Sequence, residues 1–326
     1  MKGNIKSNIK KACLKLIFKA NYILNNYNDI IWLLGDGRSG TTWVANLINH
    51  DKKFREIFEP FHPKRNIDMH FIVPHQYYRP NEINEELKSI SSTLFSGKYT
   101  NKKVDVGSHT LLYKGLLIKD IFANLLCYPT SLEFPNIKPI LLIRNPFSVA
   151  LSKSKKKNWF WGTDPLELLN QASLREDYLL PFEDLIKEVS ARNNYILNQI
   201  LIWSIINYIP LKQFKPSSIH ICFYECIYEN PNDEITKIFE FLWGTSSPQK
   251  TNITFTDEFL SKPSHVIGKD SNLLSGTSPI LSWKDEIPLN IIEDGLNIMK
   301  HFELHELYGE NGMPNINVLK KIHGVN

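Results

Sequence analysis

The chain has 326 residues, of which 42% are hydrophobic, and its 38 basic and 34 acidic residues leave a formal net charge of +4. This length allows a full buried core, whereas the nearly balanced charge argues against a nucleic-acid-binding surface. The four cysteines have neither the spacing of a metal site nor that of a disulfide framework. We therefore expect a large domain that does not bind nucleic acid. We expect it in a reducing, cytoplasmic compartment.

The N-terminal segment, residues 1–28, has apolar residues at helical spacing from Ile5 to Ile23, with lysines between them. This pattern predicts a basic amphipathic helix, and the lysines interrupt the apolar core that a signal peptide requires. We expect this helix to dock on the domain. A weak, reversible contact of residues 1–24 with a membrane surface is the alternative.

A glycine-rich turn separates a predicted strand at 30–34 from a predicted helix at 41–50. Glycines let the backbone approach an anion, and the N–H groups and dipole of the following helix favour negative charge there. The spacing from the first glycine to Gly40 and Thr42 matches a nucleotide-binding P-loop, but Thr41 stands where the phosphate-binding lysine is expected. The turn therefore predicts a phosphate site that is not equipped for a nucleoside triphosphate.

A second anion site is predicted where the apolar run 139–143 ends in Arg144. Pro146 suits the first position of a helix over 146–157, and Ser152 lies about two helical turns further on, so its hydroxyl can share a face with the strand end. A kinase or ATPase would place a carboxylate here for magnesium, whereas a guanidinium suits a phosphate oxyanion. Two such sites predict a nucleotide that is phosphorylated at two separate places.

Strands and helices alternate along the chain, which predicts an α/β fold: a P-loop-like three-layer sandwich with a central, mostly parallel sheet. We expect one domain over 29–326, with insertions near 59–80 and 158–181 that build the acceptor site; the second insertion also fits a packing lid. Further strands are expected at 54–58, 110–114 and 218–223, and further helices at 82–96, 117–127, 182–209, 232–243 and 288–301.

These motifs resemble those of the PAPS-dependent sulfotransferases, in particular the carbohydrate and bacterial-type branch. The resemblance includes residues 223–225, residues 229–231 and a C-terminal loop over 265–284. It implies 3′-phosphoadenosine 5′-phosphosulfate (PAPS) as donor, PAP as product and no metal. The residues that it implies for nucleotide binding are Arg38, Ser39, Gly40, Thr41, Thr42, Trp43, Arg144, Ser152, Gly268 and Lys269.

Within this set, Arg38 is the expected catalytic cation, because it lies in the phosphate loop where it can neutralise the leaving oxygen. Trp43 corresponds to a tryptophan that packs on adenine, although a core position on its helix is the alternative. Lys153 belongs to a run of lysines after Ser152, which fits either a solvated face or attraction of an anionic ligand.

Glu59 is the expected general base, since Glu59 and Pro60 resemble a glutamate-proline pair of tyrosylprotein and carbohydrate sulfotransferases. The alternative roles of Glu59 are a helix cap and a structural ion pair with Arg38. His109 and His62 are the alternative bases.

Lys114 resembles a lysine that cytosolic family members carry two residues before a catalytic histidine, but Leu116 occupies the position of that histidine. We expect Lys114 to contact the sulfate or the acceptor. The resulting hypothesis is transfer of a sulfuryl group from PAPS to a hydroxyl, on a carbohydrate or glycoconjugate. A nucleotide or small-molecule kinase and a non-catalytic nucleotide-binding protein are the alternatives.

Overall fold

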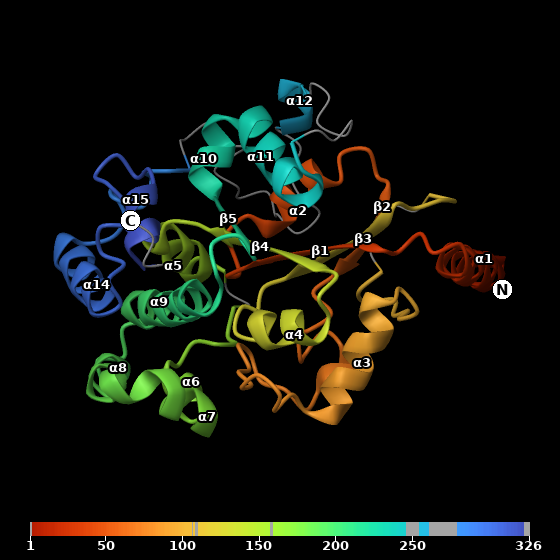
Figure 1. Cartoon of the computed structure of the whole chain (residues 1–326). Coiled ribbons are helices and arrows are strands. Elements are labelled where there is room, and N and C mark those ends of the chain that lie inside the picture. Colours follow the sequence, from red (N-terminus) through yellow and green to blue (C-terminus); the bar gives the residue numbers. More distant parts are fainter. Residues whose placement is uncertain are drawn as a thin grey trace.

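The computed structural model describes residues 2–105, 107, 110–156, 159–245, 254–260 and 279–322, the side chains of 2–11 and 258 excepted. In this part of the chain, five parallel strands form one sheet in the order β2-β3-β1-β4-β5 (Figure 1). The strands are β1 (Asp29–Gly35), β2 (Phe54–Phe58), β3 (Gly115–Asp120), β4 (Ile137–Ile143) and β5 (His220–Phe223). The predicted α/β sandwich around a parallel sheet is confirmed.

Helices cover both faces of the sheet, which gives three layers (Figure 1). One face carries α2 (Thr41–Ile48), α10 (Tyr224–Glu229) and α11 (Pro231–Trp243), and the other carries α3 (Glu85–Phe95), α4 (Cys127–Glu133), α5 (Pro146–Ser154) and α9 (Tyr195–Gln213). The remaining described helices are α1 (Lys2–Ile23), α6 (Leu166–Leu169), α7 (Ala172–Leu174), α8 (Glu183–Ala191), α12 (Asp257–Leu260), α14 (Leu289–His301) and α15 (Ile316–Ile322).

The continuous apolar run of β1 is explained by burial of both sheet faces. Trp32 and Leu34 join the larger core under α3, α4, α5 and α9, whereas Ile31 and Leu33 join the core under α2 and α11. Successive strand residues point to opposite faces, so a central strand with two covered faces requires apolar residues at every position.

One predicted strand and the helix after it were misplaced. The strand expected at 110–114 lies at Gly115–Asp120, and the helix expected at 117–127 is α4 (Cys127–Glu133). The apolar residues that suggested the earlier strand, Leu111 and Leu112, are exposed. The register explains the shift, because Gly115 pairs with the first residue of β1 and of β2.

The long helix expected at 182–209 is two helices, α8 and α9. The backbone between them turns at Asn193, whose φ of 50° is left-handed, and the side chain of Asn194 then accepts a hydrogen bond from the Leu197 N–H at the start of α9. Asparagine tolerates the left-handed conformation and is a favoured helix cap, so these two residues end one helix and begin the next.

The two predicted insertions pack against each other. The Gln171 side-chain oxygen accepts a hydrogen bond of 2.8 Å from the Tyr77 N–H, and the Tyr77 hydroxyl donates one of 2.8 Å to Asp177. Arg79 binds the same aspartate with its guanidinium at 2.8 Å. Segments about 100 residues apart in the sequence therefore form one unit.

The end of α1 is attached to the domain. Phe18 is buried, and the Asn21 side chain donates to the Leu111 carbonyl and accepts from the Tyr113 N–H, both at 2.8 Å. Leu16 and Ile23 on the same helix are exposed. Across the described segments, no helix has both the length and the apolar character that crossing a membrane would require.

Candidate active site at the carboxyl edge of the sheet

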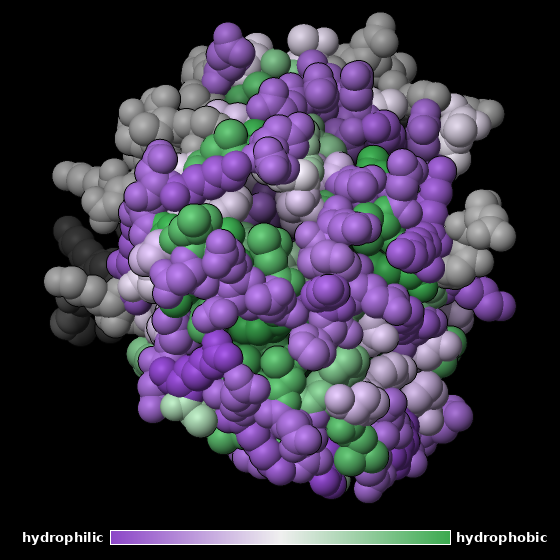
Figure 2. Space-filling view, turned by 90° about the vertical axis from the view of Figure 1, so that its left-hand side faces the viewer, coloured by the Kyte–Doolittle hydropathy of each residue, from purple (hydrophilic) through white to green (hydrophobic). Residues whose placement is uncertain are grey.

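The register brings the carboxyl ends of all five strands to one edge. Gly35 of β1 pairs with Leu142 near the end of β4, Phe58 at the end of β2 pairs with Lys119, and Ile143 pairs with Phe223. This edge lies toward α5 in Figure 1, and Figure 2 views the molecule from that side, where hydrophilic side chains predominate between separate hydrophobic groups. Ligands of parallel α/β sheets bind at this edge.

The glycine-rich turn after β1 forms a tight loop that leads into α2. The Ser39 N–H donates to the Asp36 carbonyl at 3.1 Å, and Gly40, with a φ of 91°, precedes the helix. A Cβ at Gly40 would lie 2.5 Å from the Tyr224 ring, so this position requires glycine for two reasons. The N–H groups of Trp43 and Val44 donate to the Gly40 carbonyl, whereas those of Thr41 and Thr42 have no backbone partner in the described part of the chain, which suits them to an anion.

Arg38, Arg144 and Ser152 meet beside this loop. The Arg38 Nε donates to the Ser152 hydroxyl at 3.0 Å, and an Nη of Arg144 donates to the Arg38 carbonyl at 3.1 Å. Arg38 has a left-handed φ of 72°, a conformation that is unfavourable for arginine and concentrated at functional sites. The structure thus brings together the two predicted anion sites from segments more than 100 residues apart.

Arg144 is positioned by neutral and acidic groups around it. Arg144 lies over the Tyr224 ring at 4.1 Å, and its carbonyl accepts a 3.0 Å hydrogen bond from the Trp203 indole. The Glu225 carboxylate is buried and accepts from the Asn145 N–H at 2.9 Å, which fixes the backbone directly after Arg144.

Charge and burial at this place favour an anionic ligand. Burial lowers the pKa of Arg38, and the neighbouring charge of Arg144 lowers it further. Within the described segments, the Nε of Arg144 and the hydroxyl of Ser39 are buried without a hydrogen-bond partner. Two like charges beside unpaired buried donors are stabilised by an anion that binds between them.

Trp43 is buried on α2, and its ring lies 5.6 Å from that of Tyr224. Its indole N–H has no hydrogen-bond partner in the described part of the chain. This position agrees with the alternative of a core residue on the helix, and it also lies next to the aromatic ring that covers Arg144.

A group of aromatic residues at 159–161 spans the site. Trp159 covers the phosphate loop so closely that a Cβ at Gly37 would lie 2.1 Å from its ring. Trp161 contacts Trp159 and the ring of His62, with ring centroids 5.6 Å and 5.3 Å apart. This segment therefore connects the loop with the residues that follow β2.

Glu59 lies in that second region, immediately after β2. Its φ is 51°, and its buried carboxylate is 2.5 Å from the Lys119 ammonium and 3.3 Å from the Arg65 guanidinium. Lys119 precedes Asp120 at the end of β3. Burial, and the negative charge of Glu59, raise the pKa of Asp120 well above its ordinary value.

His62 is placed beside Glu59, with its ring edge-on to Phe122 at 4.9 Å. Burial lowers its pKa to about 4, with the negative charge of Glu59 opposing this shift, so the ring is neutral near pH 7. His75 also contacts Phe122 edge-on, with ring centroids 5.0 Å apart, and burial lowers the pKa of His75 to about 3.

Lys114 is not part of this group. It precedes β3 at the amino edge of the sheet, where it forms an ion pair of 3.2 Å with Asp51. The lysine at the carboxyl edge is Lys119; the predicted strand at 110–114 begins five residues before the observed strand and therefore points to Lys114 instead. Two residues after Lys119 comes Ile121, so no histidine occupies that position either.

Lys153 is neither a solvated residue nor a ligand-facing one. It is 2% exposed, and its ammonium lies 2.7 Å from the Asp36 carboxylate. Gly268, Lys269 and His109 lie outside the described residues.

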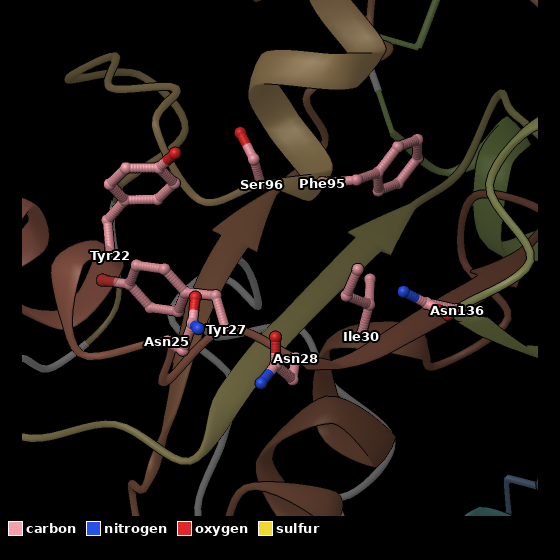
Figure 3. A pocket seen from close by; sticks show the side chains of 8 residues that line it. All are labelled: Tyr22, Asn25, Tyr27, Asn28, Ile30, Phe95, Ser96 and Asn136. Atoms are coloured by element: carbon pink, nitrogen blue, oxygen red, sulfur yellow. The ribbon is translucent and has the colours of Figure 1, made fainter.

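A separate cavity of about 200 Å³ lies near the amino end of β1 (Figure 3). Tyr22 and Tyr27 lie at one end of it and Phe95 and Asn136 at the other. Its lining residues are Tyr22, Asn25, Tyr27, Asn28, Ile30, Phe95, Ser96 and Asn136. None of them comes from the loop or from the carboxyl edge.

Comparison with known proteins identifies the family. The chain is similar in structure to the sulfotransferase domain from the curacin biosynthetic pathway (16% identity, 83% of this chain and 96% of that chain, TM-score 0.44). It is also similar to a sulfotransferase from Alicyclobacillus acidocaldarius (11%, 91% and 96%, 0.41) and to mouse sulfotransferase SULT7A1 complexed with PAP (14%, 90% and 89%, 0.37). No curated protein matches the chain in sequence. A family model described as a sulfotransferase domain matches residues 28–261, which is more than half of the chain, and the chain therefore belongs to the sulfotransferase family.

Proposed function

We propose that this chain transfers a sulfuryl group from PAPS to a hydroxyl of a carbohydrate or glycoconjugate. The observation that carries the proposal is the convergence of Arg38, Arg144 and Ser152 beside the phosphate loop. PAPS has phosphates at both ends of its ribose, and this arrangement provides donors for two separated phosphates.

The residues around the loop fit such a donor. Ser39 and the N–H groups at the start of α2 would hold the 5′-phosphosulfate, and Arg144 with Ser152 would hold the 3′-phosphate. The buried hydroxyl of Ser39 and the buried Nε of Arg144 have no partner among the residues that the structure describes, as expected of groups whose partner is a ligand. PAPS supplies the sulfuryl group; the protein supplies orientation and charge.

Arg38 is the cation that we assign to charge stabilisation. In sulfuryl transfer, negative charge develops on the oxygen that leaves sulfur, and a fixed guanidinium beside it lowers the barrier. Its hydrogen bond to Ser152 holds the guanidinium beside the residue that we assign to the 3′-phosphate. Lysine would serve less well here, because the planar group can bind Ser152 and a phosphate oxygen together.

We propose Glu59 as the general base that accepts the proton of the acceptor hydroxyl. Support comes from its place at the carboxyl edge, from its left-handed φ of 51° and from its position near Trp161 by way of His62. Lys119 and Arg65 compensate its negative charge and hold both of its oxygens. His62 is the alternative base, and its lowered pKa means that it is neutral near pH 7.

The acceptor class is inferred from the side chains next to Glu59. The half-buried Trp161 ring packs on the buried ring of His62, which packs on buried Phe122, and among the described residues the Trp161 indole N–H has no hydrogen-bond partner. Rings with a single polar N–H bind the apolar face of a sugar and one of its hydroxyl groups. The packed insertions border the same corner through His75 and Phe122, so they would select the acceptor.

The test is turnover of labelled PAPS with three acceptor panels: neutral oligosaccharides, phenols and steroids. We expect label to reach an oligosaccharide without added magnesium, and Arg38→Ala to lower the rate with the same acceptor at least a hundredfold. Transfer only to phenols or steroids would overturn the acceptor class. Failure to transfer to any panel, together with magnesium-dependent use of ATP, would overturn the proposed function.

A further inference from the structure

A buried ion pair connects the phosphate loop to the helix that carries Ser152. The Lys153 ammonium lies 2.7 Å from each carboxylate oxygen of Asp36 and 2.8 Å from the side-chain oxygen of Gln199. Asp36 and Lys153 are 1% and 2% exposed. Asp36 directly follows β1, Lys153 directly follows Ser152 on α5, and Gln199 belongs to α9.

This pair does not itself bind a ligand. An ammonium has three N–H donors, and the three contacts of Lys153 use all of them. Gln199 is also occupied, since its amide donates to the Gly162 carbonyl at 3.1 Å. The Trp159 ring, 5.6 Å from the ammonium, covers the pair from the side of the loop.

Stability is a poor explanation for such a pair. Removing two charges from water is costly, and replacing a buried ion pair by apolar residues of similar volume is often neutral or stabilising. A charged pair does, however, accept only one arrangement of its two partners, because displacement leaves two unpaired charges in the core. It is therefore suited to fixing the spacing of the two elements that carry it.

Those elements are the ones that hold the two phosphates in the proposed function. Asp36 lies two residues before Arg38, and Lys153 lies one residue after Ser152, so the loop and α5 are linked twice. The Arg38–Ser152 link is partly exposed and shares its groups with the ligand. The Asp36–Lys153 link is closed to solvent, and its groups are occupied by each other and by Gln199.

We infer that the Asp36–Lys153 ion pair is a positioning device that sets the distance between the 5′-phosphosulfate loop and the 3′-phosphate helix, so that both ends of one nucleotide bind at once. This inference rests on the proposed two-phosphate site. The consequence is a higher affinity for a nucleotide with two phosphates than for one with a single phosphate. Once one phosphate is bound, the other is already held beside its own site, so the effective concentration at that site is high.

The experiment compares the dissociation constants of adenosine 3′,5′-bisphosphate, 5′-AMP and 3′-AMP by calorimetry. The ratio of the 5′-AMP constant to the bisphosphate constant measures what the second phosphate adds. The variant is the double substitution Asp36→Leu with Lys153→Met, which removes both charges and leaves no unpaired one. The matched control is Lys88→Met with Glu133→Gln, which removes an ion pair between α3 and α4.

We expect the double variant to fold and to bind each monophosphate with a dissociation constant within about threefold of wild type. The ratio of the 5′-AMP constant to the bisphosphate constant should fall at least tenfold. The control should keep the full advantage. An unchanged advantage in the folded double variant, or equal losses for all three ligands, would overturn the positioning role. A wild-type protein without any bisphosphate advantage would instead overturn the two-phosphate site itself.

Discussion

The contact between Gly37 and Trp159 provides a sharp test of how the aromatic segment covers the phosphate loop. A methyl group at Gly37 would lie 2.1 Å and 2.4 Å from two carbons of the Trp159 ring. Non-bonded carbons prefer about 3.5–4.0 Å, so in Gly37→Ala the ring or the loop must move by more than about 1 Å. The φ of Gly37 is not positive, so the alanine backbone is allowed and the ring contact is the source of the cost.

Overpacking of this kind costs about 1–3 kcal/mol of unfolding free energy. The assay is urea unfolding of wild type, Gly37→Ala, Trp159→Ala and the double variant. We expect Gly37→Ala to lower the unfolding free energy by about 1–3 kcal/mol in the wild-type background and by less than about 0.5 kcal/mol in the Trp159→Ala background. The difference between these two values is the coupling energy of the two residues, and it is larger than the usual error of additivity.

The matched control is Gly244→Ala, where no atom lies within 4 Å of the new Cβ and only the φ of 83° opposes the substitution. Its cost should be the same with and without Trp159. If the two costs of Gly37→Ala are equal as well, the Trp159 ring does not lie on the loop, and the description of the site is wrong.

Three further outcomes follow from the same structure. Arg144→Ala should weaken binding of adenosine 3′,5′-bisphosphate by about 10–100-fold in calorimetry, because it removes a charge-assisted hydrogen bond, and should leave binding of 5′-AMP nearly unchanged. Equal losses of affinity for both ligands would make Arg144 a structural residue. Glu59→Gln should lower kcat by about a hundredfold or more while the nucleotide affinity stays the same, and near-normal turnover would move the base to His62. Burial lowers the pKa of His75 from 6.5 to about 3, so the unfolded chain binds one more proton than the folded protein between these values, and stability falls as the pH decreases through this range. His75→Phe should therefore reduce the loss of unfolding free energy by about 1.4 kcal/mol per pH unit between pH 6 and 4, and an unchanged pH dependence would show that this ring is not buried in its neutral form.

The tight turn after β1 and the proximity of Arg144 and Ser152 to it could be predicted from the sequence because their signals are local, while their binding of phosphate stays a prediction. Gly40 must adopt a positive φ next to Tyr224, and the spacing of Arg144 and Ser152 follows from the helical repeat. A run of apolar residues does not show which part of it enters a sheet, however. Exposed Leu111 was therefore taken for a strand residue, although pairing with β1 and β2 selects the residues after it.

The misplaced strand also led to a wrong prediction of the lysine at the carboxyl edge of the sheet. The prediction placed Lys114 near the strand end, whereas Lys119 lies there and binds Glu59, which follows another strand and is 60 positions away. The Asp36–Lys153 pair was equally hidden, since Lys153 belongs to a run of lysines that is typical of a solvated surface. Burial of a charge depends on a partner from a distant segment, which local patterns do not reveal.

The most direct test of the account is the melting temperature of the full chain with adenosine 3′,5′-bisphosphate, compared with AMP and with ATP plus magnesium. A ligand at about 1,000 times its dissociation constant adds about 4 kcal/mol of stability to the folded state. We predict a rise of several degrees with the bisphosphate, a smaller one with AMP and none specific to magnesium. A rise only with ATP and magnesium would contradict the two-phosphate site and indicate phosphoryl transfer instead.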